Sequence, residues 1–270
     1  MKIKSLNTLS GSYESQLIFI VLIEYFIFII SGVSLSSLHQ IPYFNIGVDP
    51  AYWIAYILNI PQFIVDHQWV GIFIDISIVS LLIGLVIYPK KNILAFVVFI
   101  LLLIFYLTLT GYLGLHKFQS GFVFILIPYL FKEKKNRSFA FETIRYFLLF
   151  FYFSAAIFKL TSSGLYNQEH FSNILSGQFA PYFIEGNLGW RTSLNLFLIN
   201  HYTISYYLYI GSFIFEFIVV VGFFTKRYDK YIGCLFLCFH LFNWIIMDIS
   251  VIGQVAFITL FFYRNKLIHT

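Results

Sequence analysis

A single lysine inside an apolar, aromatic segment is the residue of this sequence best suited to chemistry. Lys159 lies near the end of the stretch Tyr152-Phe153-Ser154-Ala155-Ala156-Ile157-Phe158-Lys159-Leu160. A charged side chain at the middle of a membrane helix costs about 2.5–3.5 kcal/mol on insertion scales, so it needs a partner, a route to water or a function. A desolvated lysine near a histidine has a lowered pKa, which suits it to act as a general base near neutral pH.

Further polar groups accompany this lysine at the same expected depth. His240 and Asn243 are three residues apart and so share one helix face, and His116 precedes another apolar run. A lone buried histidine is more often a satisfied core residue than a catalyst. Four polar groups that converge in the outer half of the membrane nevertheless predict one shared site.

Two carboxylates interrupt other apolar runs. Glu24 and Glu216 each fall near the middle of an expected helix, so we expect both to face the interior of a bundle, protonated or paired. Hydrogen bonding between helices is the purely structural alternative. Arg145 and Lys159 lie near opposite ends of one expected helix, and snorkelling toward the membrane surface would explain either of them without a function.

The composition identifies the elements that must position these groups. Of the 270 residues, 60% are hydrophobic and only 11% charged, and the mean hydropathy is +0.83. Soluble domains average about a quarter charged residues, so we predict an all-α polytopic membrane helix bundle that contacts the lipid bilayer. The net charge of +5 is spread over short clusters beside the apolar runs, which excludes nucleic acid as a partner. Cys234 and Cys238 fit neither a disulfide framework nor a zinc site, and no metal is expected.

The apolar runs predict about eight transmembrane helices in one domain over residues 1–270. Seven runs are long enough or nearly so, whereas the run over 118–131 is shorter than the roughly 20 residues of a full span. The predicted helices cover about 15–37, 70–88, 92–113, 118–131, 139–160, 204–224, 231–247 and 249–263.

The basic residues predict the orientation. With eight spans, fourteen Lys and Arg fall on one side and three on the other, and such residues accumulate in short cytoplasmic loops. Both termini and the loops at about 89–91, 132–138 and 225–230 are therefore expected in the cytoplasm. The polar segments at about 38–69 and 161–203 become outer loops, with a short amphipathic helix near 51–60 in the first.

Several of these stretches resemble a known family. The segment from Tyr152 to Leu160 is similar to the aromatic-x-Ala-Gly-x-x-Lys-Leu segment of the vitamin K-dependent γ-carboxylases and their bacterial relatives, the HTTM (horizontally transferred transmembrane) proteins. His240-Leu241-Phe242-Asn243 resembles the His-x-x-Asn helix of that family. His116 with Gly121, and Glu216 ahead of the basic cluster at 226–230, resemble two further elements. The resemblance covers about residues 110–263, in the family's helix order, and points to a small bacterial member without the lumenal domain.

The resemblance implies a chemistry and a place in the cell. It makes Lys159 the candidate general base that deprotonates a reduced quinone, with His240 and His116 as further catalytic candidates. Asn243, Tyr152 and Glu216 become candidate contacts to that cofactor. It further implies the bacterial cytoplasmic membrane and a role in peptide modification or maturation, or in quinol-linked chemistry at the outer leaflet. A soluble partner protein and a small peptide substrate are the implied partners, as in maturation systems for sporulation-delaying peptide toxins.

Two alternatives stay open. The chain could be a non-enzymatic scaffold, assembly or immunity partner that binds another membrane protein through its helices, with the carboxylates and small residues serving helix packing. A transporter is a third reading, although the sequence has no evident repeat and no paired broken helices.

Overall fold

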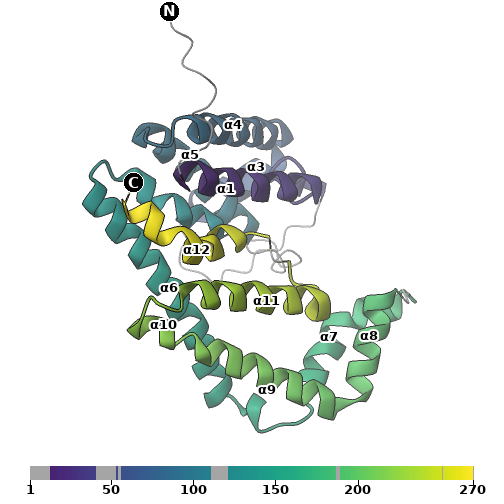
Figure 1. The fold of residues 1–270 in the computed structure, drawn as a ribbon. Coiled ribbons are helices and arrows are strands. Elements are labelled where there is room, and N and C mark those ends of the chain that lie inside the picture. The colour runs from purple at the N-terminus through teal and green to yellow at the C-terminus, as the bar shows by residue number, and fades with distance from the viewer. Residues whose placement is uncertain are drawn as a thin grey trace, which may run out of the picture. The chain divides into compact units, whose positions relative to one another are not determined.

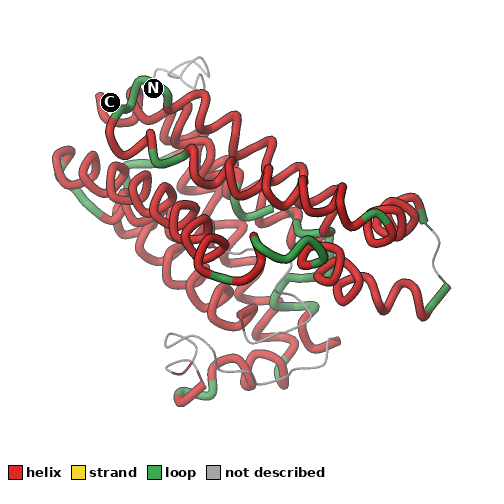
Figure 2. Tube along the Cα trace, turned by 90° about the horizontal axis from the view of Figure 1, so that it is seen from below, coloured by secondary structure: helices red, strands yellow, loops and turns green. Residues whose placement is uncertain are grey.

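A computed structural model of the chain describes residues 13–40, 53, 56–110, 121–186, 189–250 and 252–269. Throughout these ranges the chain forms helices joined by turns, without a strand (Figure 2). The prediction of an all-α fold is therefore confirmed for the described part of the chain.

Six segments are long and apolar enough to cross a membrane, which supports a multi-pass membrane protein. Their outward faces remain apolar: Phe73, Phe147 and Tyr207 are each more than half exposed, as lipid contact requires. The spans are α1 (Tyr13–Ile30), α4 (Gln68–Ile87), α5 (Asn92–Thr110), α6 (Lys134–Thr161), α9 (Tyr202–Ile218) continued by α10 (Val221–Phe224), and α11 (Asp229–Met247).

The other two predicted spans take shorter forms. The run over 118–131 contains a 3₁₀ helix, η4 (Gly121–Leu130), of 10 residues, and the last run forms α12 (Val255–His269) of 15 residues. A full span needs about 20 residues at 1.5 Å each. The count of eight spans and the cytoplasmic position of both termini therefore stay predictions.

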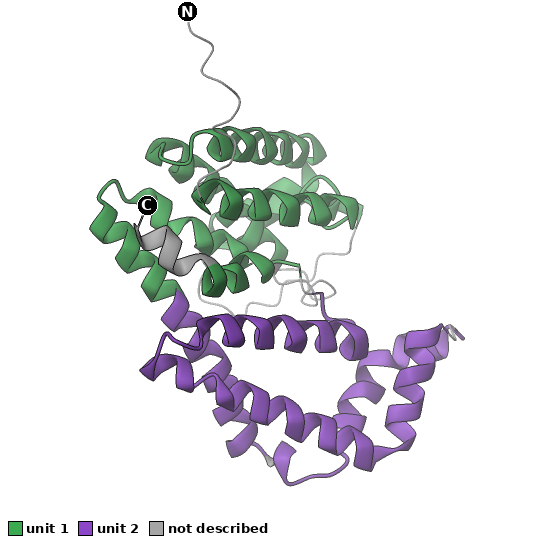
Figure 3. Ribbon diagram, in the orientation of Figure 1, with its two compact units in different colours: residues 1–144, 252–270 green, residues 145–251 purple. Residues whose placement is uncertain are grey.

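The chain divides into two compact units (Figure 3), one of residues 1–144 with 252–270 and one of residues 145–251. In the first unit α1 packs against α4 and α12, and η4 packs against α5 (Figure 1). The rings of Phe28, Phe105 and Phe122 form the centre of this packing, with 5.3 Å between the first two ring centroids. Two buried carboxylates of this unit have hydrogen-bond partners here: Glu24 Oε1 accepts the N–H of Ala256 at 3.1 Å, and Asp75 Oδ1 accepts from Tyr25 Oη at 2.6 Å.

The second unit contains a helical hairpin that the sequence analysis assigned to a polar loop. Within predicted segment 161–203 the structure has η5 (Ser163–Leu165), α7 (His170–Ile184) and α8 (Trp190–Asn200), and α7 and α8 lie side by side (Figure 1). Phe171, Leu175 and Phe179 recur every four residues on α7 and are buried, so this segment is amphipathic rather than irregular.

Asp248 fastens this hairpin to the end of α11. It occupies the left-handed backbone region at φ +53° and accepts from Arg191 Nη1 at 2.5 Å and from Tyr182 Oη at 3.2 Å. Burial and the nearby Asp248 carboxylate raise the pKa of the Tyr182 phenol, which keeps its proton available for donation. Gln178 adds a hydrogen bond to the carbonyl of Met247.

The first predicted outer loop, 38–69, contains η2 (Leu38–Gln40) and α3 (Ile60–Asp66) in its described parts. Pro61 in the first turn of α3 suits a helix start, because that position needs no N–H donor. Of the amphipathic helix predicted near 51–60, residues 51–52 and 54–55 lie outside the described residues; residues 53, 56 and 57 are helical, and 58–59 form a turn before α3 begins.

Candidate functional site

Lys159 makes its contacts with α9 rather than with the membrane surface. Its ammonium Nζ donates to Ser212 Oγ at 2.9 Å and lies 2.9 Å from Glu216 Oε2. Helical side chains tilt toward the N-terminus of their helix, which turns the lysine back along α6 and away from its nearby C-terminal end. The lysine side chain is 17% exposed and that of Glu216 is 6% exposed. The ion pair with Glu216 therefore explains how the charge of Lys159 is tolerated among apolar helices, and this explanation does not require the side chain to snorkel.

Aromatic rings enclose the same ammonium group. It lies 5.2 Å from the ring centroid of Tyr209 and 5.9 Å from that of Phe239. Both distances fall within the range of a cation–π contact, which stabilises a cation removed from water. The Ser212 hydroxyl is held in turn, because it donates to the carbonyl of Tyr209 at 2.8 Å.

A second polar pair lies between α6 and α11. Tyr152 Oη and His240 Nε2 share a short hydrogen bond, and both side chains are buried. The Tyr152 ring stacks on Phe236 at 4.2 Å between centroids and meets Phe239 edge-on at 6.0 Å. Phe239 therefore contacts Lys159 on the one hand and Tyr152 on the other, which joins the two polar pairs through one ring.

A groove between α9 and α11 opens beside these pairs. It has a volume of about 310 Å³ and is mostly apolar. Two of its lining residues, Ser212 and Phe239, also contact the ammonium group of Lys159. An apolar molecule in the groove would therefore lie against the hydroxyl that holds the lysine. The lining residues are Tyr207, Leu208, Gly211, Ser212, Phe215, Cys238, Phe239 and Phe242.

Of the other two predicted residues, Asn243 and His116, only Asn243 belongs to the described part of the chain. Asn243 is on α11 one turn beyond His240, and its backbone carbonyl accepts the N–H groups of Asp248 and Ile249 at the helix end. His116 lies outside the described residues. Lys159 and His240, expected at one depth, belong to different hydrogen-bonded pairs within the described chain.

The expectation that Arg145 snorkels to the surface is wrong. Its side chain is fully buried, and Nε and Nη2 bind the two carboxylate oxygens of Asp229 at 3.0 and 2.6 Å. Nη2 also donates to the carbonyl of Gly222 at 2.7 Å. Gly222 permits this approach because a Cβ there would lie 2.7 Å from Leu149 Cδ2. Burial of a charge is tolerated here because the partner is bidentate and hydrogen-bonded.

The sequence analysis missed Ser212, Asp229 and Asp248 as partners. Serine is common in membrane helices, so Ser212 did not stand out in the sequence. Asp229 and Asp248 lie at the two ends of α11, where an aspartate needs no buried partner, so neither indicated an ion pair. Chemically the site offers two proton-exchanging pairs, Lys159 with Glu216 and Tyr152 with His240, beside an apolar groove. The described residues contain no group of three His, Cys, Asp or Glu side chains suited to a metal. No family model, curated protein or solved structure matches this chain.

Proposed function

We propose that this chain is a multi-pass protein of the bacterial cytoplasmic membrane, similar to the HTTM and γ-carboxylase family, that performs acid–base chemistry on a reduced quinone. The observation that best supports this proposal is that Ser212 both lines the apolar groove and accepts a hydrogen bond from Lys159. A quinol combines an apolar ring with hydroxyl groups, so it suits an apolar groove in which the Ser212 hydroxyl leads to a buried amine.

The paired lysine can act as a base only after it loses a proton. Transfer of that proton from the Lys159 ammonium to the Glu216 carboxylate, 2.9 Å away, leaves a neutral amine and a neutral acid. A low-dielectric site tolerates this state because it removes two buried charges. A bound quinol would then supply a hydroxyl proton to the neutral Lys159 amine, which would restore its ammonium group. Tyr209 and Phe239 stabilise the ammonium formed.

Tyr152 and His240 form a second proton-exchanging pair in the same proposal. Their hydrogen bond lies behind Phe239, which lines the groove. In this proposal the pair supports the Phe239 ring, so Tyr152 acts through that ring rather than as the direct contact to the quinone that the resemblance implies. A soluble partner and a small peptide substrate, also implied by the resemblance, belong to this proposal as the components that would use the activated quinol.

The test compares quinol-dependent activity of wild type with three variants, in membranes that contain the native partner. We expect Lys159→Ala to abolish activity and Ser212→Ala to lower it about tenfold, because an alanine removes one hydrogen bond to a charged group. Glu216→Gln keeps the shape but not the proton acceptor and should also be inactive. Equal activity in well-folded Lys159→Ala and wild type would falsify the catalytic role.

A scaffold or assembly partner is the second candidate, and the ion pair itself favours it. Lys159 and Glu216 tie α6 to α9, as a structural contact between membrane helices would. Lys159→Arg separates the two functions. Arginine keeps the positive charge but does not release its proton near neutral pH. A scaffold should retain partner binding in this variant, whereas the proposed quinol chemistry should be lost.

A further inference from the structure

A basic cleft lies at one end of the first unit, where several spans begin or end. It has a volume of about 210 Å³ and is lined by residues of three segments: the start of α1, the turn between α4 and α5, and the start of α6. The lining residues are Glu14, Lys90, Asn92, Lys132, Lys134, Arg137 and Ser138. Four cationic side chains against one carboxylate leave the cleft strongly positive.

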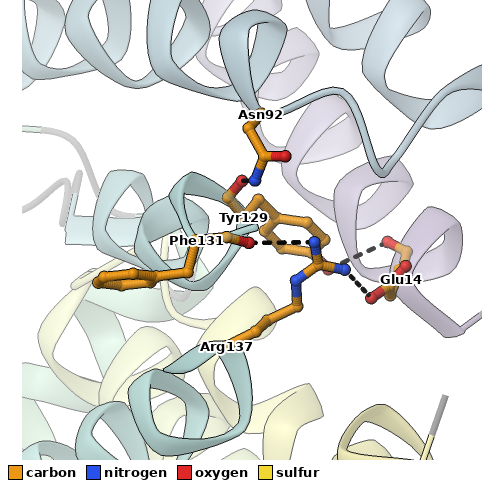
Figure 4. Close-up of polar contacts among 5 residues, drawn as sticks. All are labelled: Glu14, Asn92, Tyr129, Phe131 and Arg137. Carbon is orange, nitrogen blue, oxygen red and sulfur yellow. Dashed lines mark hydrogen bonds and ion pairs between the residues drawn. The ribbon is translucent and has the colours of Figure 1, made fainter. Parts of the chain in front are cut away.

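Interactions among the walls hold the cleft in place (Figure 4). Arg137 Nη1 binds Glu14 Oε1 at 2.8 Å, and Nη2 donates to the carbonyl of Phe131 at 3.2 Å. Asn92 Nδ2 donates to the carbonyl of Tyr129 at 2.8 Å, and Tyr129 Oη donates to the carbonyl of Glu14 at 3.2 Å. These bonds join α1, α5, η4 and α6, so the fold sets the positions of Glu14, Asn92 and Arg137 before any ligand enters.

Two polar atoms of this framework still need partners. Arg137 Nε and Glu14 Oε2 are buried without a hydrogen bond to any described residue. The side chain of Glu14 is 2% exposed and that of Arg137 is 11% exposed, so neither atom is freely hydrated. A donor and an acceptor left over on two residues that line one cleft call for a ligand that offers both an acceptor and a donor. A phosphate oxygen supplies the first and a headgroup hydroxyl the second.

The lysines of the cleft also suit a ligand that carries a phosphate group. Lys90 and Lys132 are exposed side chains with no ion-pair partner in the described chain, and lysine binds phosphate as a compact point charge. The ends of α4, α5 and α6 place these lysines at the depth where lipid headgroups lie. Basic pockets between membrane helices on one membrane face are a known mode of anionic lipid recognition.

We propose that this cleft binds the phosphate of an anionic phospholipid whose headgroup carries a hydroxyl, as in phosphatidylglycerol. Lys90, Lys132 and Lys134 surround the phosphate, Arg137 Nε donates to one of its oxygens, and the headgroup hydroxyl donates to Glu14 Oε2. The cleft shares no lining residue with the groove of α9 and α11, and the proposal does not depend on quinol chemistry.

The test uses the full chain in lipid nanodiscs of phosphatidylcholine, with and without phosphatidylglycerol. Lipid retained by the protein is measured by native mass spectrometry, and stability by thermal unfolding. The cleft variant is Lys90→Gln/Lys132→Gln. Its matched control is Lys91→Gln/Lys135→Gln, which removes the same charge from neighbouring exposed positions that do not line the cleft.

We expect wild type and the control to retain phosphatidylglycerol and to melt at higher temperature in its presence. The cleft variant should bind it about 30-fold more weakly, because each lysine near the surface contributes roughly fivefold. Equal retention by the cleft and control variants, with all proteins melting alike in phosphatidylcholine, overturns the proposal. Stabilisation of wild type by inorganic phosphate, with none from phosphatidylglycerol, overturns the lipid as the source of the phosphate group.

Discussion

The carboxylate of Glu24, in the middle of α1, accepts the backbone N–H of Ala256 at the start of α12. The first N–H groups of any helix have no partner within that helix, and a helix that starts in an apolar core cannot rely on water for them. Gly253, at φ +93°, turns the chain into this position. A buried acid that looked like a functional residue thus satisfies a helix end.

This relationship predicts the behaviour of two substitutions. Glu24→Leu leaves the Ala256 N–H buried without a partner, so we expect the free energy of unfolding to fall by about 1–3 kcal/mol. Glu24→Gln keeps an acceptor oxygen and should cost much less. Unfolding in mixed micelles measures both variants. A Glu24→Leu protein as stable as wild type would contradict the assigned role.

The buried pair of Arg145 and Asp229 makes a second prediction. Arg145→Ala removes the bidentate cation from the Asp229 carboxylate, and Asp229→Ala removes the bidentate acceptor from the Arg145 guanidinium, so each should cost about 3–5 kcal/mol. The double variant should cost less than the sum, because the second substitution no longer breaks the pair. Arg227→Ala, an exposed change in the neighbouring turn, is the control and should be nearly neutral. Additive losses would argue against direct coupling.

The groove provides a third prediction through two glycines. Gly211 lines the groove and Gly177 lies on α7, and a Cβ added at either meets no atom within 4 Å. Gly211→Leu should therefore fold, and its side chain should fill part of the groove. We expect quinol binding to weaken at least about tenfold, because the ligand loses apolar contact equivalent to one buried side chain. Gly177→Leu should bind like wild type. Titration of a short-chain naphthoquinol, followed by protein fluorescence, measures both. Equal affinities would place the ligand elsewhere.

The hairpin of α7 and α8 supplies a fourth prediction. Arg191→Ala removes the contact to Asp248, and we expect faster hydrogen exchange in both helices. The cost should stay near 1 kcal/mol or below, because the two side chains are 24% and 25% exposed and water screens the pair. Glu185→Ala, an exposed change in the same hairpin, is the control. Unchanged exchange in Arg191→Ala would show that apolar packing and the hydrogen bonds of Gln178 and Tyr182 hold the hairpin without the ion pair.

The sequence predicted features that follow from the cost of placing polar groups in lipid. The apolar spans and the burial of Glu24 and Glu216 belong to this class, because a mid-helix carboxylate has few other options. The partners could not be predicted in the same way. Ala256 lies 232 residues from Glu24, and nothing local to either residue indicates the other.

The errors have physical reasons as well. Arg145 was assigned to the surface by its distance from the helix end, but a bidentate partner at Asp229 changes the balance between burial and hydration. The segment 161–203 contains many Gly, Asn and Ser residues, which suggested a loop. The spacing of Phe171, Leu175 and Phe179 was the available signal for α7, and it outweighs the polar composition because all three side chains are buried.

The pairing of Lys159 also constrains how the protein is made. Ser212, the nearer of the two α9 partners along the chain, follows the lysine by 53 residues. At about 5–20 residues per second, the ribosome needs roughly 3–11 s to add them. During that interval α6 is already synthesised while the carboxylate of Glu216 does not yet exist. The order of synthesis therefore requires α6 to wait with its lysine end hydrated or held by the insertion machinery, and to settle into the bilayer only when α9 arrives.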